Sequence, residues 1–350
     1  MNQSTVSSQW NFDLAELASV LRDRFGARVR LGEPLSRHGT FGVGGLADAW
    51  LAIDNEPDMI ALVSLAAERR WPLMLVGNGT NLLYTDAGVR GIVVQNAQAQ
   101  WELTDLGDGT ARLIGGAGVN LPKLVNDLAA KGWAGLEWGA GVPGSLGGAV
   151  ISNAGAHGTS LSNTLQSARV LDARDLEAGP QVHDYRLEEL QMAYRDSRFR
   201  SRRKIEFGEE GRPLPPPRGL IEPAEIVTSV TCLLRQDEPE RLKARVAHYK
   251  QHRKETQPPQ ASAGSVFKNP PGDFSGRLIE AAGLKGTQIG KAQISPRHAN
   301  FIVNLGGARA ADITALIALA RRTVQQQFGV ELELEIELRG EMEGFVPKEA

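Results

Sequence analysis

Apolar side chains recur along the chain at two different periods. In residues 12–26 they fall at steps of three and four, a spacing that predicts an amphipathic helix. The sequence also predicts helices at residues 57–70, 121–131, 237–254 and 311–328. Short apolar runs predict strands at residues 48–53, 72–76, 91–95, 111–116, 165–172 and 227–234. Because helices and strands alternate, we expect a mixed α and β fold.

In the last predicted strand, residues 330–338, apolar and polar residues alternate strictly. Its apolar positions are Leu332, Leu334, Ile336 and Leu338. Its polar positions are Glu331, Glu333, Glu335 and Glu337. Successive side chains of a strand point to opposite faces, so one face should be apolar and the other a row of four carboxylates. The pattern leaves two interpretations open: the row is a solvated edge, or one of the four carboxylates turns into a cleft.

The amino-acid composition of the chain changes at residues 200–223. Residues 201–204 are mostly basic, and residues 213–217 are rich in proline, which cannot join a strand ladder or a helix interior. We therefore expect an exposed loop or insertion here, with its charges forming a solvated surface.

Composition and charge narrow the class of protein. The chain has 350 residues, enough for two or three domains, and is 41% hydrophobic and 23% charged, as is typical of globular proteins. A net charge of −2 argues against a general nucleic-acid or membrane-surface binder. The polar first ten residues show no signal peptide, and no apolar run is long enough to span a membrane, so we expect a cytoplasmic protein.

Cysteine and histidine offer little metal chemistry. A single cysteine, Cys232, excludes an intramolecular disulfide and any cysteine-rich metal site, and its place in an apolar run predicts a buried core thiol. His248 and His252 lie four residues apart on a predicted helix, but they have basic neighbours and no acid between them. We assign them to a solvated face and expect no metal site.

Glycine is enriched, at 39 of 350 residues, and one cluster follows a predicted strand. Residues 77–83 (Gly-Asn-Gly-Thr-Asn-Leu-Leu) are called the first glycine loop below. Glycine lets consecutive backbone N–H groups point into a concavity suited to phosphate. An ordinary turn is the alternative. The candidate ligand-binding residues are Gly77, Asn78, Gly79, Thr80 and Asn81.

A second cluster, residues 141–148, is called the second glycine loop. Gly139, Gly141 and Gly144 match the dinucleotide-binding pattern G-x-G-x-x-G, but a proline interrupts the loop and no acidic residue lies between Glu137 and Asp172. We therefore reject a Rossmann site, and no Walker A motif is present. The remaining interpretation is that the glycine-rich backbone of this loop closely approaches a flat ligand or a pyrophosphate. The candidates are Gly141, Pro143, Gly144, Ser145, Gly147, Gly148, Asn153 and Gly155.

Five motifs, taken together and in order, resemble the UDP-N-acetylenolpyruvoylglucosamine reductases, flavoenzymes of peptidoglycan precursor synthesis. They are residues 77–83, 141–148, 194–197, 262–270 and 286–290. The resemblance runs from about residue 35 to residue 340 and is to the shorter, type II form. The chain departs from the family pattern in two places: Gly39 stands where a polar residue is usual, and the Pro-rich stretch 201–223 is longer than expected.

The resemblance implies an α+β fold: an FAD-binding fold of the vanillyl-alcohol-oxidase (PCMH) type in two α/β subdomains, plus a C-terminal α+β substrate domain. The expected first subdomain is residues 1–98, joined by the C-terminal strand 330–340. The second subdomain is residues 99–236, and the substrate domain is residues 237–329.

The resemblance also implies a reaction. NADPH reduces non-covalently bound FAD, and the hydride then passes to the enolpyruvyl group of a UDP-sugar, UDP-N-acetylglucosamine enolpyruvate. The implied catalytic residues are Arg195 for the substrate carboxylate, Ser265 as proton donor and a protonated Glu335 for the enolate. Each has a simpler interpretation when it is taken alone: a surface ion pair, a turn cap and an edge carboxylate. The residues do not distinguish NADPH from NADH.

Further residues are implied for the UDP-sugar: Tyr194, Arg253, Lys268, Asn269 and His298. For His298 a structural role is equally open. Two other functions compete, a flavin oxidase that reduces oxygen and a UDP-sugar-binding module without flavin. The serine motif argues against the first and the intact glycine loops argue against the second. The sequence makes no prediction of the oligomeric state.

Overall fold

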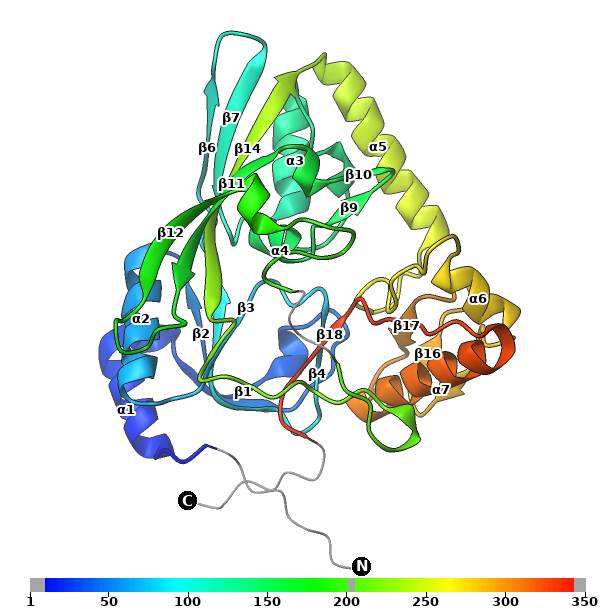
Figure 1. Cartoon of the computed structure of the whole chain (residues 1–350), viewed down its shortest axis with the longest axis horizontal. Coiled ribbons are helices and arrows are strands. Elements are labelled where there is room, and N and C mark those ends of the chain that lie inside the picture. Colours follow the sequence, from blue (N-terminus) through cyan, green and yellow to red (C-terminus); the bar gives the residue numbers. More distant parts are fainter. Residues whose placement is uncertain (1–9, 201–204, 343–350) are drawn as a thin grey trace, which may run out of the picture.

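The computed structural model describes residues 10–200 and 205–342, so the basic run 201–204 lies outside the described residues (Figure 1). The helices are α1 (Leu14–Phe25), α2 (Glu56–Glu68), α3 (Leu121–Ala130), α4 (Leu146–Ile151), α5 (Pro239–Thr256), α6 (Ser275–Ala281) and α7 (Ala310–Phe328). All five predicted helices are present. The last one ends at Phe328, as predicted, and Gly329 caps it with a left-handed φ of 69°.

The first sheet is mostly parallel and has the order β1-β2-β5-β3-β13. Its strands are β1 (Arg30–Pro34), β2 (Leu46–Ile53), β3 (Leu73–Val76), β5 (Val89–Asn96) and β13 (Ile221–Glu222). The helices α1 and α2 pack against it through buried side chains such as Leu17, Leu21 and Leu62. Asp13 fixes the start of α1, because its carboxylate accepts the backbone N–H of Ala15 at 2.7 Å.

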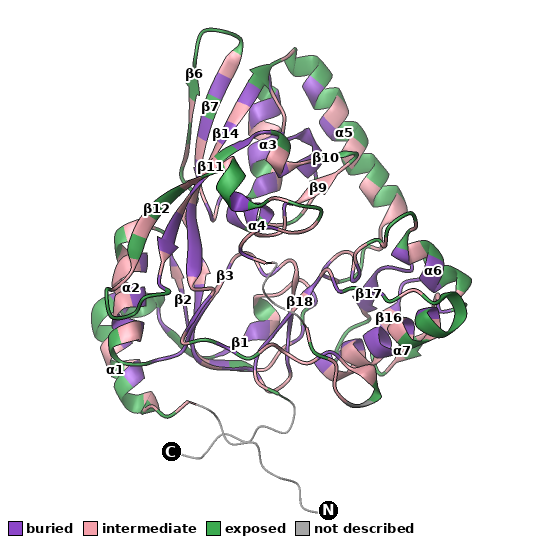
Figure 2. Cartoon of the chain, in the orientation of Figure 1, coloured by how far each residue is buried: buried purple, intermediate pink, exposed green. Residues whose placement is uncertain are grey.

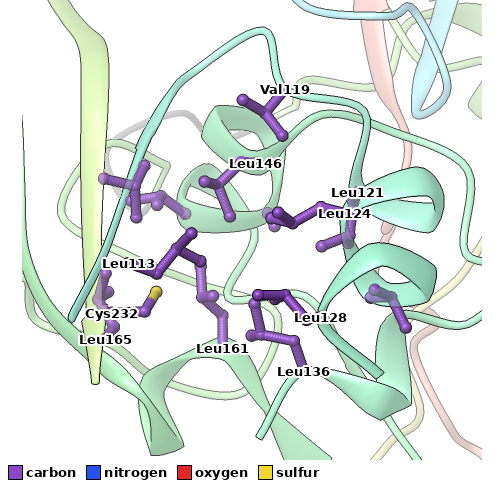
Figure 3. Close-up of a cluster of buried hydrophobic side chains, with 14 of the residues drawn as sticks. Leu113, Val119, Leu121, Leu124, Leu128, Leu136, Leu146, Leu161, Leu165 and Cys232 are labelled. Atoms are coloured by element: carbon purple, nitrogen blue, oxygen red, sulfur yellow. The ribbon is translucent and has the colours of Figure 1, made fainter. Parts of the chain in front are cut away.

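The second sheet is antiparallel, with the order β12-β11-β14-β7-β6. Its strands are β6 (Trp101–Asp105), β7 (Thr110–Gly116), β11 (Leu165–Asp172), β12 (Gln181–Arg186) and β14 (Glu225–Gln236), with β8 (Trp133–Ala134) pairing to β14. Helices α3, α4 and α5 contribute to the buried cluster on this sheet. Cys232 lies inside that cluster, beside Leu113 and Leu165, so the predicted core thiol is confirmed (Figure 3).

A third, smaller unit contains the antiparallel sheet β15 (Gln288–Ile289), β16 (Ala292–Ile294) and β17 (Ile302–Asn304), together with α6 and α7. The last strand, β18, covers only Glu337–Arg339 and pairs in parallel with β4 (Leu82–Tyr84). The predicted strand 330–338 is therefore wrong in its extent. Residues 330–336 find no continuous partner strand, so they form only an isolated bridge between Leu334 and Phe267. The alternation itself persists, because all four apolar positions are buried.

The predicted exposed loop of residues 200–223 is also wrong in its second half. Ile221 and Glu222 are buried and form β13, which adds to the edge of the first sheet beside β3. The Arg218 side chain is only 4% exposed and contacts the Glu341 carboxylate at 3.0 Å. The proline-rich run brings these residues back into the protein, and a buried ion pair replaces the expected solvated charge.

Many buried residues lie in strands of the two large sheets, such as β2 and β14, whereas α5 is exposed along most of its length (Figure 2). Leu242 and Val246 of α5 belong to the cluster of the second sheet. The subdomain boundaries proposed from the sequence stay a prediction. Within residues 10–200 and 205–342, no helix is both long enough and apolar enough to cross a membrane.

Candidate active site

A pocket of about 420 Å³ lies where segments from several of the buried hydrophobic clusters meet. One wall is the first glycine loop, which follows β3. A second wall is the second glycine loop with the start of α4. The third wall is formed by Ser265 and by the C-terminal segment that ends in β18, which runs through the middle of the molecule beside β4 (Figure 1).

The first glycine loop is tightly backed by residues 38–41. A Cβ at Gly79, where φ is 63°, would overlap the carbonyl oxygen of His38, and the Thr40 N–H donates to the Gly79 carbonyl at 3.2 Å. The segment that departs from the family pattern thus supports this loop from behind. Gly39 itself faces the Tyr84 ring, where a Cβ would lie 3.2 Å from a ring carbon.

The second glycine loop faces the first across a narrow gap. A Cβ at Gly77 would lie 3.0 Å from the Ser145 hydroxyl, and a Cβ at Gly144 would lie 3.2 Å from the Thr80 hydroxyl. The Ser145 hydroxyl accepts the Gly148 N–H at 3.2 Å and so caps α4. Glycine on both sides of the gap keeps the backbone accessible to a ligand.

The Ser265 and Glu335 segments are held together by backbone hydrogen bonds. The Glu335 N–H donates to the Val266 carbonyl, and the Lys268 N–H donates to the Glu333 carbonyl, both at 2.8 Å. This short antiparallel contact brings two residues that are distant in the sequence to one wall of the pocket. The Ser265 hydroxyl has no hydrogen-bond partner within the described parts of the chain and is free to contact a ligand.

Glu335 and Arg195 form an ion pair inside the pocket, with Arg195 Nε 3.0 Å from Glu335 Oε1. The Nε–H makes no hydrogen bond with any described residue, so the contact is electrostatic. Arg195 has φ of 52°, a conformation rare outside glycine and often found at functional sites. Burial raises the pKa of Glu335 above 4.5, although Arg195, Arg200 and Lys268 act to lower it.

Arg253 enters the same pocket from the last turn of α5, and Gln257 follows directly after the helix. Burial, with a smaller contribution from Arg195, lowers the pKa of Arg253. Among the described residues no carboxylate pairs with Arg253. The described pocket lining thus holds three guanidinium groups and two carboxylates, and the carboxylates pair with Arg195 and Arg339. The charge of Arg253 leaves capacity for an anionic ligand.

The structure brings most of the sequence-predicted site residues to this one pocket. Those that line it are Gly77, Asn78, Gly79, Thr80, Asn81, Pro143, Gly144, Ser145, Gly147, Gly148, Gly155, Arg195, Arg253, Ser265 and Glu335. Six others do not line it: Gly141, Asn153, Tyr194, Lys268, Asn269 and His298. Of these six, Gly141 lies against the Arg253 side chain, where a Cβ would be 3.4 Å from Cδ.

The remaining five of these residues have structural partners or lie on the surface. Asn153 is buried and donates to the Ala193 carbonyl at 2.8 Å. Lys268 pairs with Glu333 at 2.6 Å, and the Asn269 side chain accepts the Ser275 N–H at 3.1 Å. Tyr194 is 59% exposed beside Arg195. The His298 ring packs against Phe301 with 4.8 Å between centroids, and burial lowers the pKa of His298.

Sequence reasoning missed several residues of the pocket wall, including Asn96, Phe301, Glu337 and Arg339. Arg339 pairs with the buried Glu222 at 3.0 Å and also contacts Glu337. The alternation in residues 330–338 marked Glu337 as a carboxylate of unknown surroundings, but no local pattern marked the other three. The row of four carboxylates divides: Glu331 and Glu333 are exposed, whereas Glu335 and Glu337 line the pocket.

Comparison with known proteins agrees with this geometry. Residues 47–175 match the family model "FAD binding domain", and residues 256–339 match "UDP-N-acetylenolpyruvoylglucosamine reductase, C-terminal domain". The UDP-N-acetylenolpyruvoylglucosamine reductase of Chloroflexus aggregans is 42% identical over 88% of this chain and 96% of its own. A second reductase, from Symbiobacterium thermophilum, is 37% identical over 95% of this chain and 98% of its own.

A solved structure agrees as well. The crystal structure of UDP-N-acetylenolpyruvylglucosamine reductase from Thermus caldophilus is 36% identical, covers 89% of this chain and 99% of its own, and superposes with a TM-score of 0.68. The fold and the pocket thus define an FAD-dependent oxidoreductase of α+β architecture, as the sequence predicted. The chain belongs to the UDP-N-acetylenolpyruvoylglucosamine reductase family.

The residues of the pocket fit FAD. At Gly77 and Gly144 a Cβ would lie only 3.0 and 3.2 Å from a hydroxyl of the facing loop, closer than ordinary van der Waals contact. Glycine at these two positions therefore keeps the gap open for a phosphate-bearing ligand. Histidine and cysteine, the side chains most suited to covalent flavin attachment, are absent from the described pocket lining. This composition supports a non-covalent cofactor.

Proposed function

We propose that this protein uses NADPH to reduce the enolpyruvyl group of UDP-N-acetylglucosamine enolpyruvate, giving UDP-N-acetylmuramate for peptidoglycan synthesis. A hydride adds to the terminal vinyl carbon and a proton adds to the neighbouring carbon, which bears the carboxylate. NADPH is oxidised to NADP⁺. Membership of the reductase family supports the reaction, and the arrangement of Arg195, Glu335 and Ser265 around one pocket supports the roles that follow.

FAD, when bound, supplies a carrier that accepts hydride from NADPH and delivers it to the substrate. The two glycine loops would hold it through backbone N–H groups and the side chains of Thr80 and Ser145. Gly147 keeps the second loop packed closely, since a Cβ at this position would lie 2.5 Å from the Ala117 side chain. The loops thereby fix the cofactor's place relative to the third wall.

Arg195 is the proposed partner of the substrate carboxylate, because a planar guanidinium matches a carboxylate with two donors. It is placed in the pocket by a strained backbone and by its contact with Glu335. Arg253 adds a second positive charge without a carboxylate partner of its own in the described chain. Together they favour binding of an anionic substrate and stabilise the charge that develops as hydride adds.

Glu335 is the proposed acid that hydrogen-bonds the enolate, and its burial is the single observation that carries the mechanism. Burial already raises its pKa with Arg195 as its neighbour. When Arg195 pairs with the substrate carboxylate, ionised Glu335 loses its nearest positive charge. This loss favours the neutral form of Glu335 further. Ser265, on the adjoining segment and with an unoccupied hydroxyl, then donates the proton to carbon.

The UDP part of the substrate is assigned to residues outside the pocket lining. Tyr194, Lys268, Asn269 and His298 remain candidates, reached from the third wall that carries Ser265. Lys268 and Asn269 lie three and four residues after Ser265, which supports a substrate that extends from the pocket along this segment.

The reaction is tested by supplying the purified protein with NADPH and the enolpyruvyl UDP-sugar. We expect one product per NADPH consumed, with a mass that corresponds to gain of two hydrogen atoms. NADPH consumption that continues at the same rate without the UDP-sugar, and that depends on oxygen, would instead identify a flavin oxidase.

A further inference from the structure

Asn81, in the first glycine loop, lines the pocket, and its side-chain amide group also contacts the C-terminal segment. Its Nδ2 donates a hydrogen bond of 2.9 Å to the backbone carbonyl of Glu335. Its own backbone carbonyl accepts the Glu337 N–H, also at 2.9 Å. One residue of the first glycine loop therefore makes two hydrogen bonds to the segment that carries the Glu335 carboxylate.

The two hydrogen bonds of Asn81 join a larger arrangement. On the far side of the segment, the Glu335 N–H donates to Val266, and beyond Asn81 the parallel pairing of β4 with β18 continues through Leu82 and Leu83. The Glu335 backbone is thus tied to the Ser265 segment on one side and to the cofactor loop on the other. Because both ties end on the Glu335 main chain, next to the carboxylate, small movements of the loop are transmitted to it.

We propose that Asn81 is a positioning residue for Glu335: it couples the cofactor loop to the segment that bears the acid, so that filling the loop fixes the carboxyl group in the pocket. The inference rests on the proposed role of Glu335. It assigns to Asn81 a task that neighbouring Asn78 does not share, since within the described chain the Asn78 side chain has one hydrogen bond, which Oδ1 accepts from Gln95 Nε2 at 3.4 Å.

The variant Asn81→Ala removes the donor and keeps both backbone contacts, and Arg200 still donates to the same Glu335 carbonyl, so the segment should stay folded. A lost hydrogen bond of average strength predicts roughly three- to tenfold faster hydrogen–deuterium exchange in residues 333–339. This measurement needs no turnover and can be made with and without FAD. Asn78→Ala, the matched control in the same loop, should leave exchange in residues 333–339 unchanged.

Kinetics separate positioning from a general loss of structure. In FAD-loaded Asn81→Ala, we expect reduction by NADPH to stay within about twofold of the unsubstituted protein. The limiting rate of reoxidation by the enolpyruvyl substrate should fall about tenfold at little-changed KM, as for a group that acts only on the transition state. In the double variant Asn81→Ala/Glu335→Gln, the asparagine substitution should add almost nothing, because its effect passes through Glu335.

The outcomes distinguish this inference from the proposed function. If Glu335→Gln alone leaves reoxidation unaffected, the proposed role of Glu335 fails, and the exchange data still test whether Asn81 holds the segment. If Glu335→Gln is impaired but Asn81→Ala matches the unsubstituted protein in exchange and in both rates, the coupling through Asn81 is overturned. Equal losses in the two half-reactions, or a full additive loss in the double variant, would also overturn it.

Discussion

Arg195 Nε and Glu335 Oε1 lie 3.0 Å apart, within a pocket lined by two glycine loops. Ordinarily such a contact keeps a carboxyl group ionised, yet burial raises the pKa of Glu335. The arginine serves two purposes in turn. It steadies Glu335 before the substrate enters, and in the proposed reaction it turns to the substrate carboxylate and leaves a carboxyl group ready to act as a neutral hydrogen-bond donor.

Glu335→Gln should lose far more activity than Glu333→Gln. Glutamine keeps the shape but cannot act as an acid, so reoxidation of the reduced protein by the enolpyruvyl substrate should slow by about 10²–10⁴-fold. Glu333 is 71% exposed and pairs with Lys268 at the surface, where such a pair contributes at most about 1 kcal/mol to stability. Stopped-flow reoxidation of the two variants makes the comparison. Equal, mild losses would remove Glu335 from the mechanism.

The raised pKa of Glu335 predicts a pH dependence with a definite sign. In the proposed mechanism the protonated form of Glu335 is the active one, so the limiting rate of reoxidation should be constant at low pH and fall as pH rises through the pKa of Glu335 in the folded protein. Glu335→Gln should lack this decline. A variant profile that falls as steeply as the unsubstituted one would assign the decline to another group.

The raised pKa of Glu335 also predicts an effect on the stability of the folded protein. The unfolded chain ionises Glu335 at a lower pH than the folded protein does, so above the ordinary pKa of glutamate its ionisation favours unfolding. Glu335→Gln should therefore be at least as stable as the unsubstituted protein at neutral pH, in thermal unfolding without substrate. A markedly lower Tm would mean that the ion pair with Arg195 outweighs the cost of burial.

Ser265→Ala should slow one half-reaction and spare the other. The hydroxyl is needed only when the substrate carbon is protonated, a contribution of about 10²–10⁴-fold for general acid catalysis. Reduction by NADPH involves no such proton and should keep its rate. Rapid-mixing measurements of the two steps test this directly, and slowing of both steps by the same factor would argue against a proton-donor role.

Arg218→Met should destabilise the protein although Arg218 is not among the residues that line the pocket. The guanidinium is buried, donates to the Arg90 carbonyl at 3.0 Å and pairs with Glu341. Its removal takes this cationic partner from the Glu341 carboxylate, which keeps the Arg90 N–H as a donor at 3.3 Å. Breaking a buried pair typically costs about 3–5 kcal/mol. Arg212→Met, in the same segment but paired only at the surface, should cost at most about 1 kcal/mol. Similar Tm values for the two variants would contradict the buried pair.

Local signals in the sequence were enough for much of this fold. The spacing in residues 12–26 gave the first helix, and glycine clusters after β3 and before α4 marked both loops of the pocket. The alternation in residues 330–338 identified the buried positions even where no ladder forms. Such signals survive because side-chain periodicity depends only on the local backbone.

Features that depend on distant partners could not be predicted in the same way. Residues 330–336 look like a strand, but a strand needs a continuous neighbour. In the described chain residues 330–336 have an isolated bridge at Leu334, and continuous pairing begins at Glu337. Arg218 resembles a surface residue in a proline-rich loop until Glu341 is brought beside it. The amide of Asn81 looked like a cofactor ligand because nothing nearby in the sequence shows that it reaches Glu335.

The central claim, that one pocket passes hydride from NADPH to an enolpyruvyl UDP-sugar, is tested most directly without oxygen. The purified, FAD-loaded protein is reduced with one equivalent of NADPH, freed of nucleotide, and mixed with the UDP-sugar while the flavin absorbance is followed. We predict rapid and complete return of the oxidised spectrum, with one reduced product per flavin. A flavin that stays reduced with the UDP-sugar and is reoxidised only when air is admitted would contradict the account.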